Sequence, residues 1–474
     1  MSVVKGLLAT ALAFGFISMI GCSDEESDEN PPVISNLSHT DNEKVIGSRT
    51  INFSVDVTDD VGATVTITHN NVEVSSTKTN DTYTASITLE DRDNNDIAVS
   101  ASDADNTTAE TVTLNYPFLA FTNGQAASVV IGQQNFESFD PNQNGTRGAN
   151  TLAFGSGVSV IGNQLFISDN GNDRVLGYNA IPADNNANAD FVIGQTDFST
   201  TDVGETSTTL FSPSSVTYDG NHFFILNGIR RRANHWGFIP ANNSVGADFV
   251  IGQADFGPGD NTCAQNILRN GYSAVAADGK LIVGDTNRII IWTTISTSSG
   301  ANADLVLGQQ IFTNCSGNIQ GSPTASTLRG VVNVWSDGTR LVVTDNANNR
   351  VLIWNSFPTS NGQAADLVLG QANFTTVVPP TATASSLSPG AITSNGNQLF
   401  IEDRASARVL IWDSWPTTDN QPADRVLGAN DFDGDITDLT NASLFVDAVG
   451  LATAEGSLLL LDSNNSRVLV FNAP

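Results

Sequence analysis

Residues 304–312 read DLVLGQQIF, a phrase that recurs along most of the chain. Each copy centres on a glycine that is followed four residues later by Phe and, in all copies but the first, preceded four residues earlier by Asp. The six glycines are Gly132, Gly194, Gly252, Gly308, Gly370 and Gly428. Their regular spacing identifies internal repeats, and each repeat is long enough for one supersecondary unit.

A second phrase recurs inside each repeat. Residues 157–179 read GVSVIGNQLFISDNGNDRVLGYN, and residues 331–355 read VVNVWSDGTRLVVTDNANNRVLIWN. Each predicts a strand, a tight turn, a second strand that ends in Asp, a polar turn and a third strand that begins with Arg. The DLVLGQ phrase is then a fourth strand. Four short strands per repeat and six repeats predict an all-β, six-bladed β-propeller over residues 117–474.

The second phrase contains the motif Leu-apolar-apolar-x-Asp-x-x-x-x-Arg-Val. This motif resembles the repeat of the NHL propellers, and the DLVLGQ variant is similar to bacterial proteins of that type. The resemblance implies a ring that must close. The last repeat stops after its third strand, 467–472, whereas residues 127–133 form a fourth strand that no blade precedes. We therefore expect Val129–Ile131 to pair with Val468–Val470 and remove two open sheet edges.

The first residues are typical of an export signal. Residues 6–20 are apolar, too few to cross a bilayer, and an acidic stretch follows Cys22. The Gly21-Cys22 junction resembles the bacterial lipoprotein box, which implies a signal peptide at 1–21, lipidation of Cys22 and an outer-membrane location facing the periplasm or the surface. The alternative is an ordinary secretory signal that is cleaved nearby. Residues 22–31 are polar and acidic, as in a flexible tether.

Residues 32–116 alternate between apolar and polar positions in four short runs, 50–57, 64–68, 83–89 and 97–101. Turns rich in Asn, Asp and Gly separate the runs, a pattern that predicts a small β-sandwich. The stretch resembles the bacterial Ig-like domains of exported proteins, which implies a spacer role.

The charge balance excludes one class of partner. The chain has 474 residues, with 50 acidic and 20 basic residues and a formal net charge of −30. Such a chain repels phosphate backbones, so we expect no nucleic-acid partner.

Features that occur in every blade are expected to be structural. The Asp and Arg that flank the polar turn could form a ring of catalytic pairs. Because the pair occurs in almost every blade, we expect a structural role instead, in which Asp accepts the N–H groups of the turn and pairs with Arg. The aromatic residue four positions after each Arg could stack on a sugar, but we expect it to pack between blades. These aromatic residues are Tyr178, Trp236, Trp292, Trp354, Trp412 and Phe471.

The second repeat departs from this pattern. Asn227 replaces the repeat Asp, and Arg230, Arg231 and Arg232 stand together in the turn, followed by His235. Three adjacent Arg residues could bind a carboxylate or phosphate ligand or an acidic partner. The alternative is an exposed turn that meets the acidic surface of its own ring.

Two further groups are candidates for cross-links or ions. Cys263 and Cys315 follow the phrase glycines of adjacent repeats, so a disulfide between two connections on one face is expected. Calcium is the one candidate cofactor: Asp431, Asp433 and Asp435 resemble part of a calcium loop, although no bidentate Glu follows. A further acidic set lies near the ends of the sandwich strands: Asp91, Asp93, Asp96, Asp103 and Asp105. Solvated turns are the alternative for both sets.

The functional prediction is binding or scaffolding in the cell envelope by a monomer, with the long connections as the recognition face and a protein or glycan as partner. Two alternatives remain open. One is a hydrolase or lyase with its site in the central funnel, as in some six-bladed relatives that use His, Asp and Glu ligands. The chain has four His, two of them outside the repeats, and it has no Gly-x-Ser-x-Gly nucleophile motif. The other is a purely structural envelope protein.

Overall fold

The computed structural model describes residues 30–45, 50–59, 62–90, 94–242, 245–437, 440, 441, 443, 445 and 448–473. The signal peptide, Cys22 and most of the tether lie outside the described residues. The described part is almost entirely β-structure and divides into two compact units. None of the described helices is long and apolar enough to span a bilayer.

The first nine strands form a small Ig-like β-sandwich of two sheets, ordered β1-β3-β7-β6 and β2-β9-β8-β4-β5. The four predicted runs are all strands. The bounds are β1 Val33–Ser35, β2 Glu43–Lys44, β3 Thr50–Thr58, β4 Thr64–His69, β5 Val72–Val74, β6 Ser76–Thr79, β7 Thr82–Thr88, β8 Asn95–Ser102 and β9 Thr107–Asn115. Alternate residues are buried, as Phe53, Val55 and Val57 on β3 illustrate. This period-2 burial is what the alternating sequence predicts.

The remaining strands form the six-bladed propeller, and every blade is a four-stranded antiparallel sheet. Blades 1 to 3 consist of β11 Gly157–Ile161, β12 Gln164–Asp169, β13 Arg174–Tyr178 and β14 Phe191–Ile193; β15 Pro213–Tyr218, β16 Phe223–Asn227, β17 Arg232–Trp236 and β18 Phe249–Ile251; and β19 Gly271–Ala277, β20 Lys280–Asp285, β21 Arg288–Trp292 and β22 Leu305–Leu307.

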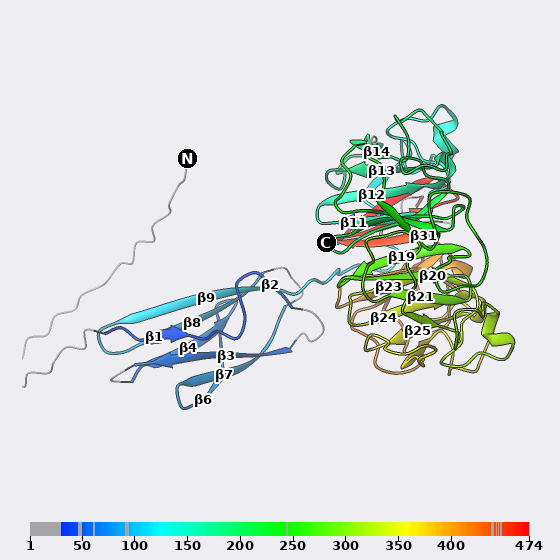
Figure 1. The fold of residues 1–474 in the computed structure, drawn as a ribbon. Helices are drawn as coiled ribbons and strands as arrows, with labels where there is room; N and C mark the ends of the chain where they lie inside the picture. Colours follow the sequence, from blue (N-terminus) through cyan, green and yellow to red (C-terminus); the bar gives the residue numbers. More distant parts are fainter. Residues whose placement is uncertain are drawn as a thin grey trace, which may run out of the picture. The chain divides into compact units, whose positions relative to one another are not determined.

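Blades 4 to 6 follow the same order, except that the fourth strand of blade 6 is β10. Their strands are β23 Val331–Ser336, β24 Leu341–Asp345, β25 Arg350–Trp354 and β26 Leu367–Leu369; β27 Pro389–Ser394, β28 Leu399–Asp403, β29 Arg408–Trp412 and β30 Arg425–Leu427; and β31 Ala448–Ala454, β32 Ser457–Asp462, β33 Arg467–Asn472 and β10 Val129–Ile131. In Figure 1 strands β11, β12, β13 and β14 follow one another outward from the centre of the ring.

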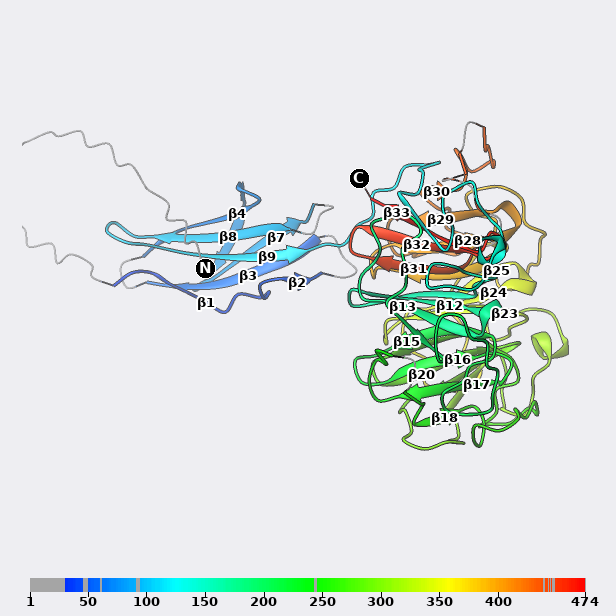
Figure 2. The ribbon, with the colours of Figure 1, turned by 90° about the horizontal axis from the view of Figure 1, so that it is seen from above.

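The ring closes through the predicted strand pair. β10 is antiparallel to β33, with Val129 opposite Val470, Val130 opposite Leu469 and Ile131 opposite Val468. The first strand of each blade contacts the first strands of both neighbouring blades, and β31 contacts β11 in the same way. Figure 2 shows the propeller from a second direction. The N-terminal strand therefore removes the open edge that blade 6 would otherwise have.

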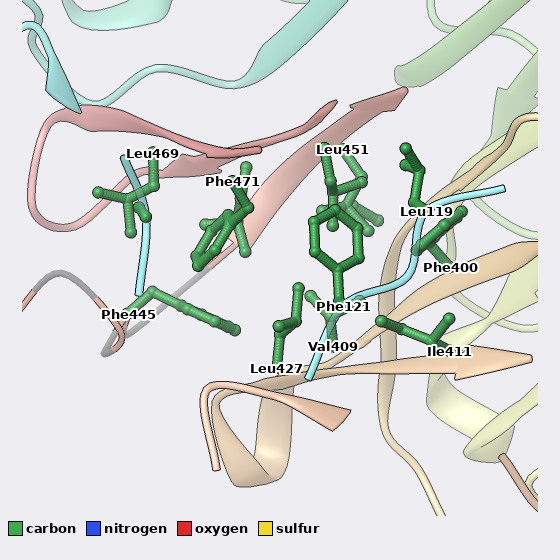
Figure 3. Close-up of a cluster of buried hydrophobic side chains, with 14 of the residues drawn as sticks. Leu119, Phe121, Phe400, Val409, Ile411, Leu427, Phe445, Leu451, Leu469 and Phe471 are labelled. Carbon is green, nitrogen blue, oxygen red and sulfur yellow. The ribbon is translucent and has the colours of Figure 1, made fainter. Parts of the chain in front are cut away.

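Apolar side chains fill the spaces between blades. Between blades 5 and 6, Phe400 and Val409 meet Leu460 and Leu469, and Phe121 from the segment before β10 packs into the same cluster. Figure 3 shows Phe121, Phe400, Val409 and Leu469 among the side chains of this cluster. Phe121 and Phe400 lie edge to face, with ring centroids 6.4 Å apart. Burial of such side chains is the main driving force for holding blades together.

The recurring DLVLGQ phrase is explained residue by residue, as blade 3 shows. Gly308 has φ +79°, and a Cβ there would lie 2.7 Å from a Leu328 side-chain atom, so no other residue fits without strain. Asp304 accepts the backbone N–H of Thr293 at 2.7 Å, which fixes the connection between the third and fourth strands. Gln309 is buried and donates to the carbonyls of Asn287 and Ser316. The Asp, Gly and Gln of the phrase thus hold the fourth strand against the segments that surround it.

Candidate functional site

The repeat Asp–Arg pairs are structural, as predicted. In five blades the Arg Nε donates to the Asp Oδ2 at 2.6–2.9 Å, and both side chains are almost fully buried. The pairs are Asp169–Arg174, Asp285–Arg288, Asp345–Arg350, Asp403–Arg408 and Asp462–Arg467. The other Asp oxygen differs from the prediction. It accepts N–H groups from the segment that enters the first strand rather than from the turn; in blade 1, for example, the backbone N–H of Ala153 donates to Asp169 Oδ1 at 2.8 Å.

The aromatic residue of the third strand also has a structural role. Trp292 is 1% exposed, and its Nε1 donates to the carbonyl of Ala301 at 3.1 Å. Trp236, Trp354 and Trp412 donate to the carbonyl nine residues ahead in the same way. These rings are therefore inaccessible to a sugar.

A cavity of about 800 Å³ lies on the axis of the ring and is lined by the first strands of all six blades. Its described lining consists of small, hydroxyl, amide and aliphatic side chains together with Tyr218, Tyr272 and Trp335. Arg404 is the only charged residue among them, and that lining contains no Asp, Glu, His or Cys. In a chain with 50 acidic residues, this channel is exceptional in its neutrality.

Many hydroxyl groups of the channel join neighbouring blades. Ser159 Oγ donates to the Val216 carbonyl at 2.6 Å, and Ser215 Oγ donates to the Ala274 carbonyl at 3.1 Å. Thr453 Oγ1 donates to the Ser394 carbonyl at 3.2 Å. These bonds occupy polar groups along the edges of the innermost strands, which would otherwise be unpaired.

One end of the propeller carries the long connections between blades and the turns between second and third strands, and we call it the loop face. The connections span 132–156, 194–212, 252–270, 308–330, 370–388 and 428–447. At the mouth of the channel on this face, the residue directly after each repeat Asp or Asn is not the same in all blades, although blades 1 and 4 both have Asn there. These residues are Asn170, Gly228, Thr286, Asn346 and Arg404 in blades 1 to 5. The mouth therefore lacks the symmetry of the ring that supports it.

The loop face also displays apolar side chains. Of the eleven large hydrophobic residues that are exposed in the described propeller, ten lie on this face, and Phe238 lies at the opposite end. The ten are Phe139, Phe154, Val203, Ile229, Tyr272, Ile311, Ile319, Val377, Val378 and Ile436. These residues therefore lie at the end of the propeller that carries the long connections. The sequence signal for them is weak, because it consists of single apolar residues within polar loops.

At the other end of the channel, Trp335 and Trp415 face each other with ring centroids 5.4 Å apart. The Arg340 guanidinium lies 3.8 Å from the Trp415 ring centroid and bonds Asp337 at 2.6 Å. Sequence reasoning missed this cluster because Trp335 and Trp415 come from different repeats and the other repeats have no Trp at either position.

The Arg turn of blade 2 meets acidic and carbonyl groups of its own ring. Arg230 bonds Glu205 at 2.9 Å, and Arg231 donates to the Arg269 carbonyl at 2.8 Å. Arg232 is fully buried and occupies the repeat Arg position. Burial, together with the charge of Arg230, lowers the pKa of Arg232 to about 10. Ligand binding by Arg230, Arg231 and Arg232 stays a prediction, and in the described structure all three side chains make bonds within the protein.

His235 lies on the third strand of blade 2, where the other blades have Gly, Ile or Val. Its ring stacks on Phe249 with centroids 4.0 Å apart, and its Nε2 lies 2.9 Å from His222 Nδ1. Burial and the neighbouring His222 lower the pKa of His235 to about 4. His235 is 4% exposed and forms part of the blade interior.

Cys263 and Cys315 form the expected disulfide, with their Cα atoms 6.2 Å apart. The bond joins the connection that follows blade 2 to the connection that follows blade 3 on the loop face.

The acidic sets form hydrogen-bonded turns. Asp431 accepts the N–H groups of Asp433 and Asp435, and Asp435 accepts those of Thr437. Asp103 accepts the N–H groups of two following residues. Asp91 and Asp93 lie outside the described residues. Within the described ranges no group of three His, Cys, Asp or Glu residues is arranged to hold a metal ion.

No family model and no curated protein matches the chain. Among solved structures, an auxiliary nutrient binding protein from Bacteroides ovatus matches with 10% identity and a TM-score of 0.41, over 93% of this chain and 98% of that one. A suggested phosphatase from Bacteroides thetaiotaomicron matches with 9% identity and a TM-score of 0.42, over 94% and 97%. Titin domain M4 matches 18% of this chain and 94% of its own, with 20% identity and a TM-score of 0.16. These scores are too low to carry a functional argument.

Proposed function

We propose that this protein is an exported binding protein of the cell envelope, anchored in the outer membrane through Cys22, whose propeller recognises a protein partner on its loop face. The observation that carries the proposal is the gathering of ten of the eleven exposed large hydrophobic residues of the described propeller at that end. Apolar side chains that gather on one face are a mark of protein–protein interaction. We further assign the repeats to the NHL type, on the recurring phrase with Asp and Arg-Val.

The electrostatics support a partner with an uncharged contact segment. The chain has a formal net charge of −30, yet the described channel lining carries a single charge, that of Arg404. An acidic segment would be repelled by the surface as a whole, and a basic one would find no carboxylate in the channel. A neutral segment that inserts at the asymmetric mouth would meet the amides of Asn170 and Asn346 and the ring of Tyr272.

The alternative, a hydrolase or lyase in the central funnel, has less support. General acid–base and metal-assisted hydrolysis use His, Asp, Glu or Cys at the reacting centre. The described lining of the channel contains none of these residues.

Site-specific photo-cross-linking in cells tests the recognition face. We expect a photoreactive amino acid at Ile229, which is 49% exposed on the loop face, to cross-link a discrete protein. The matched control is Phe238, which is 52% exposed at the opposite end and should give no such product. Equal products from both positions would argue against a dedicated face, and binding of the purified chain to a glycan array alone would replace the protein partner with a glycan.

The anchor requires a separate test. Cys22→Ala should abolish incorporation of labelled fatty acid and release the protein from the membrane fraction. Retention of the label in this variant would show that the anchor is not at Cys22, and it would leave the recognition face untouched.

A further inference from the structure

Blade 2 contains a buried positive charge without the carboxylate that all other blades supply. In the five regular blades the repeat Arg donates to the repeat Asp. In blade 2 the residue opposite Arg232 is Asn227. The Oδ1 of Asn227 accepts the backbone N–H of Phe211 at 3.1 Å, which is the role of one Asp oxygen elsewhere. The Nδ2 of Asn227 therefore stands where the second Asp oxygen accepts from Arg in the other blades. Asn227 Nδ2 and the Arg232 guanidinium are both hydrogen-bond donors, so they do not bond each other.

The second terminal nitrogen of Arg232, Nη2, also differs from its counterpart in blade 4, which bonds two carbonyls. In blade 4, Arg350 Nη2 donates to the carbonyls of Thr324 and Thr327 at 2.9 and 2.8 Å. In blade 2, Arg232 Nε donates to Asn234 Oδ1 at 3.2 Å and Nη1 donates to two carbonyls, but Nη2 has no acceptor within the described ranges.

The amide that fills this space in blade 4 is missing too. Asn348, three residues after the repeat Asp, donates to Asp345 at 2.7 Å. The corresponding residue of blade 2 is Arg230, whose side chain extends away to Glu205. Glu205 is thereby engaged by another Arg, and its side chain is 42% exposed.

Three buried donors result, and they lie close together. They are Arg232 Nη2, Asn227 Nδ2 and Asn234 Nδ2, and none of them has an acceptor among the residues that the structure describes. All three residues are 0% exposed. Asn227 pairs with Arg232 across the strands, and Asn234 bonds Arg232 directly. Leaving such groups unsatisfied is costly, and an uncompensated buried charge costs still more.

We infer that Asn227, Arg232 and Asn234 bind one small monovalent anion, of which chloride is the physiological representative. One positive charge and three neighbouring donors without acceptors match such an ion, which can accept several hydrogen bonds at once. Full burial excludes a larger carboxylate or phosphate ester, and a single compensating charge favours a monovalent ion. The ion replaces the carboxylate that the other blades carry on the chain.

The first experiment measures thermal unfolding of the purified chain in chloride and in gluconate at constant ionic strength and pH. Above the dissociation constant, each tenfold increase in chloride should raise the midpoint by about 2 °C, because the ion binds only the folded state. Asn227→Asp supplies the missing carboxylate and should abolish this dependence. Asn349→Asp is the matched control: it adds a carboxylate to the turn of blade 4, where Asp173 stands in blade 1, and should keep the wild-type dependence.

The second experiment locates the ion. Crystals soaked in bromide should give an anomalous peak within hydrogen-bonding distance of Arg232, Asn227 and Asn234, and the peak should be missing in Asn227→Asp. A midpoint independent of chloride, or a water without anomalous signal at this position, would overturn the inference. An equal chloride response in wild type and Asn227→Asp would place the ion elsewhere and would also overturn it.

Discussion

Blades 2 and 4 have the same four strands, yet their interiors differ in polarity. In both blades the last residue of the second strand stands opposite the first residue of the third, Asn227 opposite Arg232 and Asp345 opposite Arg350. In blade 4 these two side chains form an ion pair at 2.6 Å, whereas blade 2 has no carboxylate at this position. The shared register shows that strand pairing and apolar packing set the blade, while the ion pair compensates a buried Arg that the blade already contains.

The largest expected effect comes from removing that Arg from a regular blade. Arg350→Met leaves Asp345 buried without its charged partner and should lower the free energy of unfolding by about 3–5 kcal/mol. In chloride-free gluconate, Arg232→Met removes a charge that has no carboxylate partner and should change the free energy of unfolding by about 1 kcal/mol or less. Denaturant unfolding of the two variants in gluconate makes the comparison, and equal losses would mean that blade 2 has a counter-charge on the chain itself.

The next effect concerns the connection that leaves blade 2. Replacing Cys263 and Cys315 by Ser opens a loop with a sequence separation of 52 residues and should cost about 4 kcal/mol in the chain-entropy model. Reduction of the wild-type protein should produce the same loss. The double variant serves as the control, because a reductant should not change its stability; a further loss would reveal another reducible bond.

The polar interior of blade 2 should also make its stability depend on pH. His235 has a pKa of about 4 in the fold against an ordinary value of 6.5, so the unfolded chain takes up the proton first as the pH falls. The contribution of His235 is complete above about pH 6.5 and is lost as the pH falls to about 4, by roughly 3 kcal/mol. His235→Ile restores an apolar residue that other blades have and should flatten the unfolding profile in this window. An unchanged profile would assign the pH dependence to other groups.

The smallest effect is a coupling between two positions of blade 2. Asn227→Asp should stabilise, whereas Asn234→Leu alone removes the acceptor of Arg232 Nε and should destabilise. Once the carboxylate is present, Asn234→Leu should be tolerated, because the other blades have Leu or Ile at the corresponding position. A double-mutant cycle should therefore give a favourable coupling of about 1 kcal/mol, and additive effects would show that the two sites act independently.

The repeat made the fold predictable to the level of individual strand pairs. Because each blade must bury both faces and close its edges, the surplus strand at 129–131 had one partner available, and the predicted register with 468–470 is confirmed. The role of Gln309 was missed, although Gln recurs at this position. A recurring Gln in the sequence does not show which carbonyls its amide contacts, here those of Asn287 and Ser316.

The site was less predictable than the fold. The change at Asn227 is visible in the sequence, and so is the Arg cluster of the turn. Sequence spacing does not show that Arg230 turns outward to Glu205 while Arg232 stays buried. The apolar side chains of the loop face come from connections without a common pattern, so only the three-dimensional arrangement collects them. The neutrality of the channel likewise depends on which face of each first strand points inward.

The pairing of β10 with β33 has a consequence for how the protein is made. Val129 and Val470 are 341 positions apart along the chain, and the ribosome synthesises the earlier residue first. Blade 6 cannot be completed until nearly the whole propeller sequence has been delivered, and the early strand must wait for it. Premature release of a shortened chain would leave an incomplete blade open to proteases. The closing strand thus makes completion of blade 6 depend on the synthesis of β33.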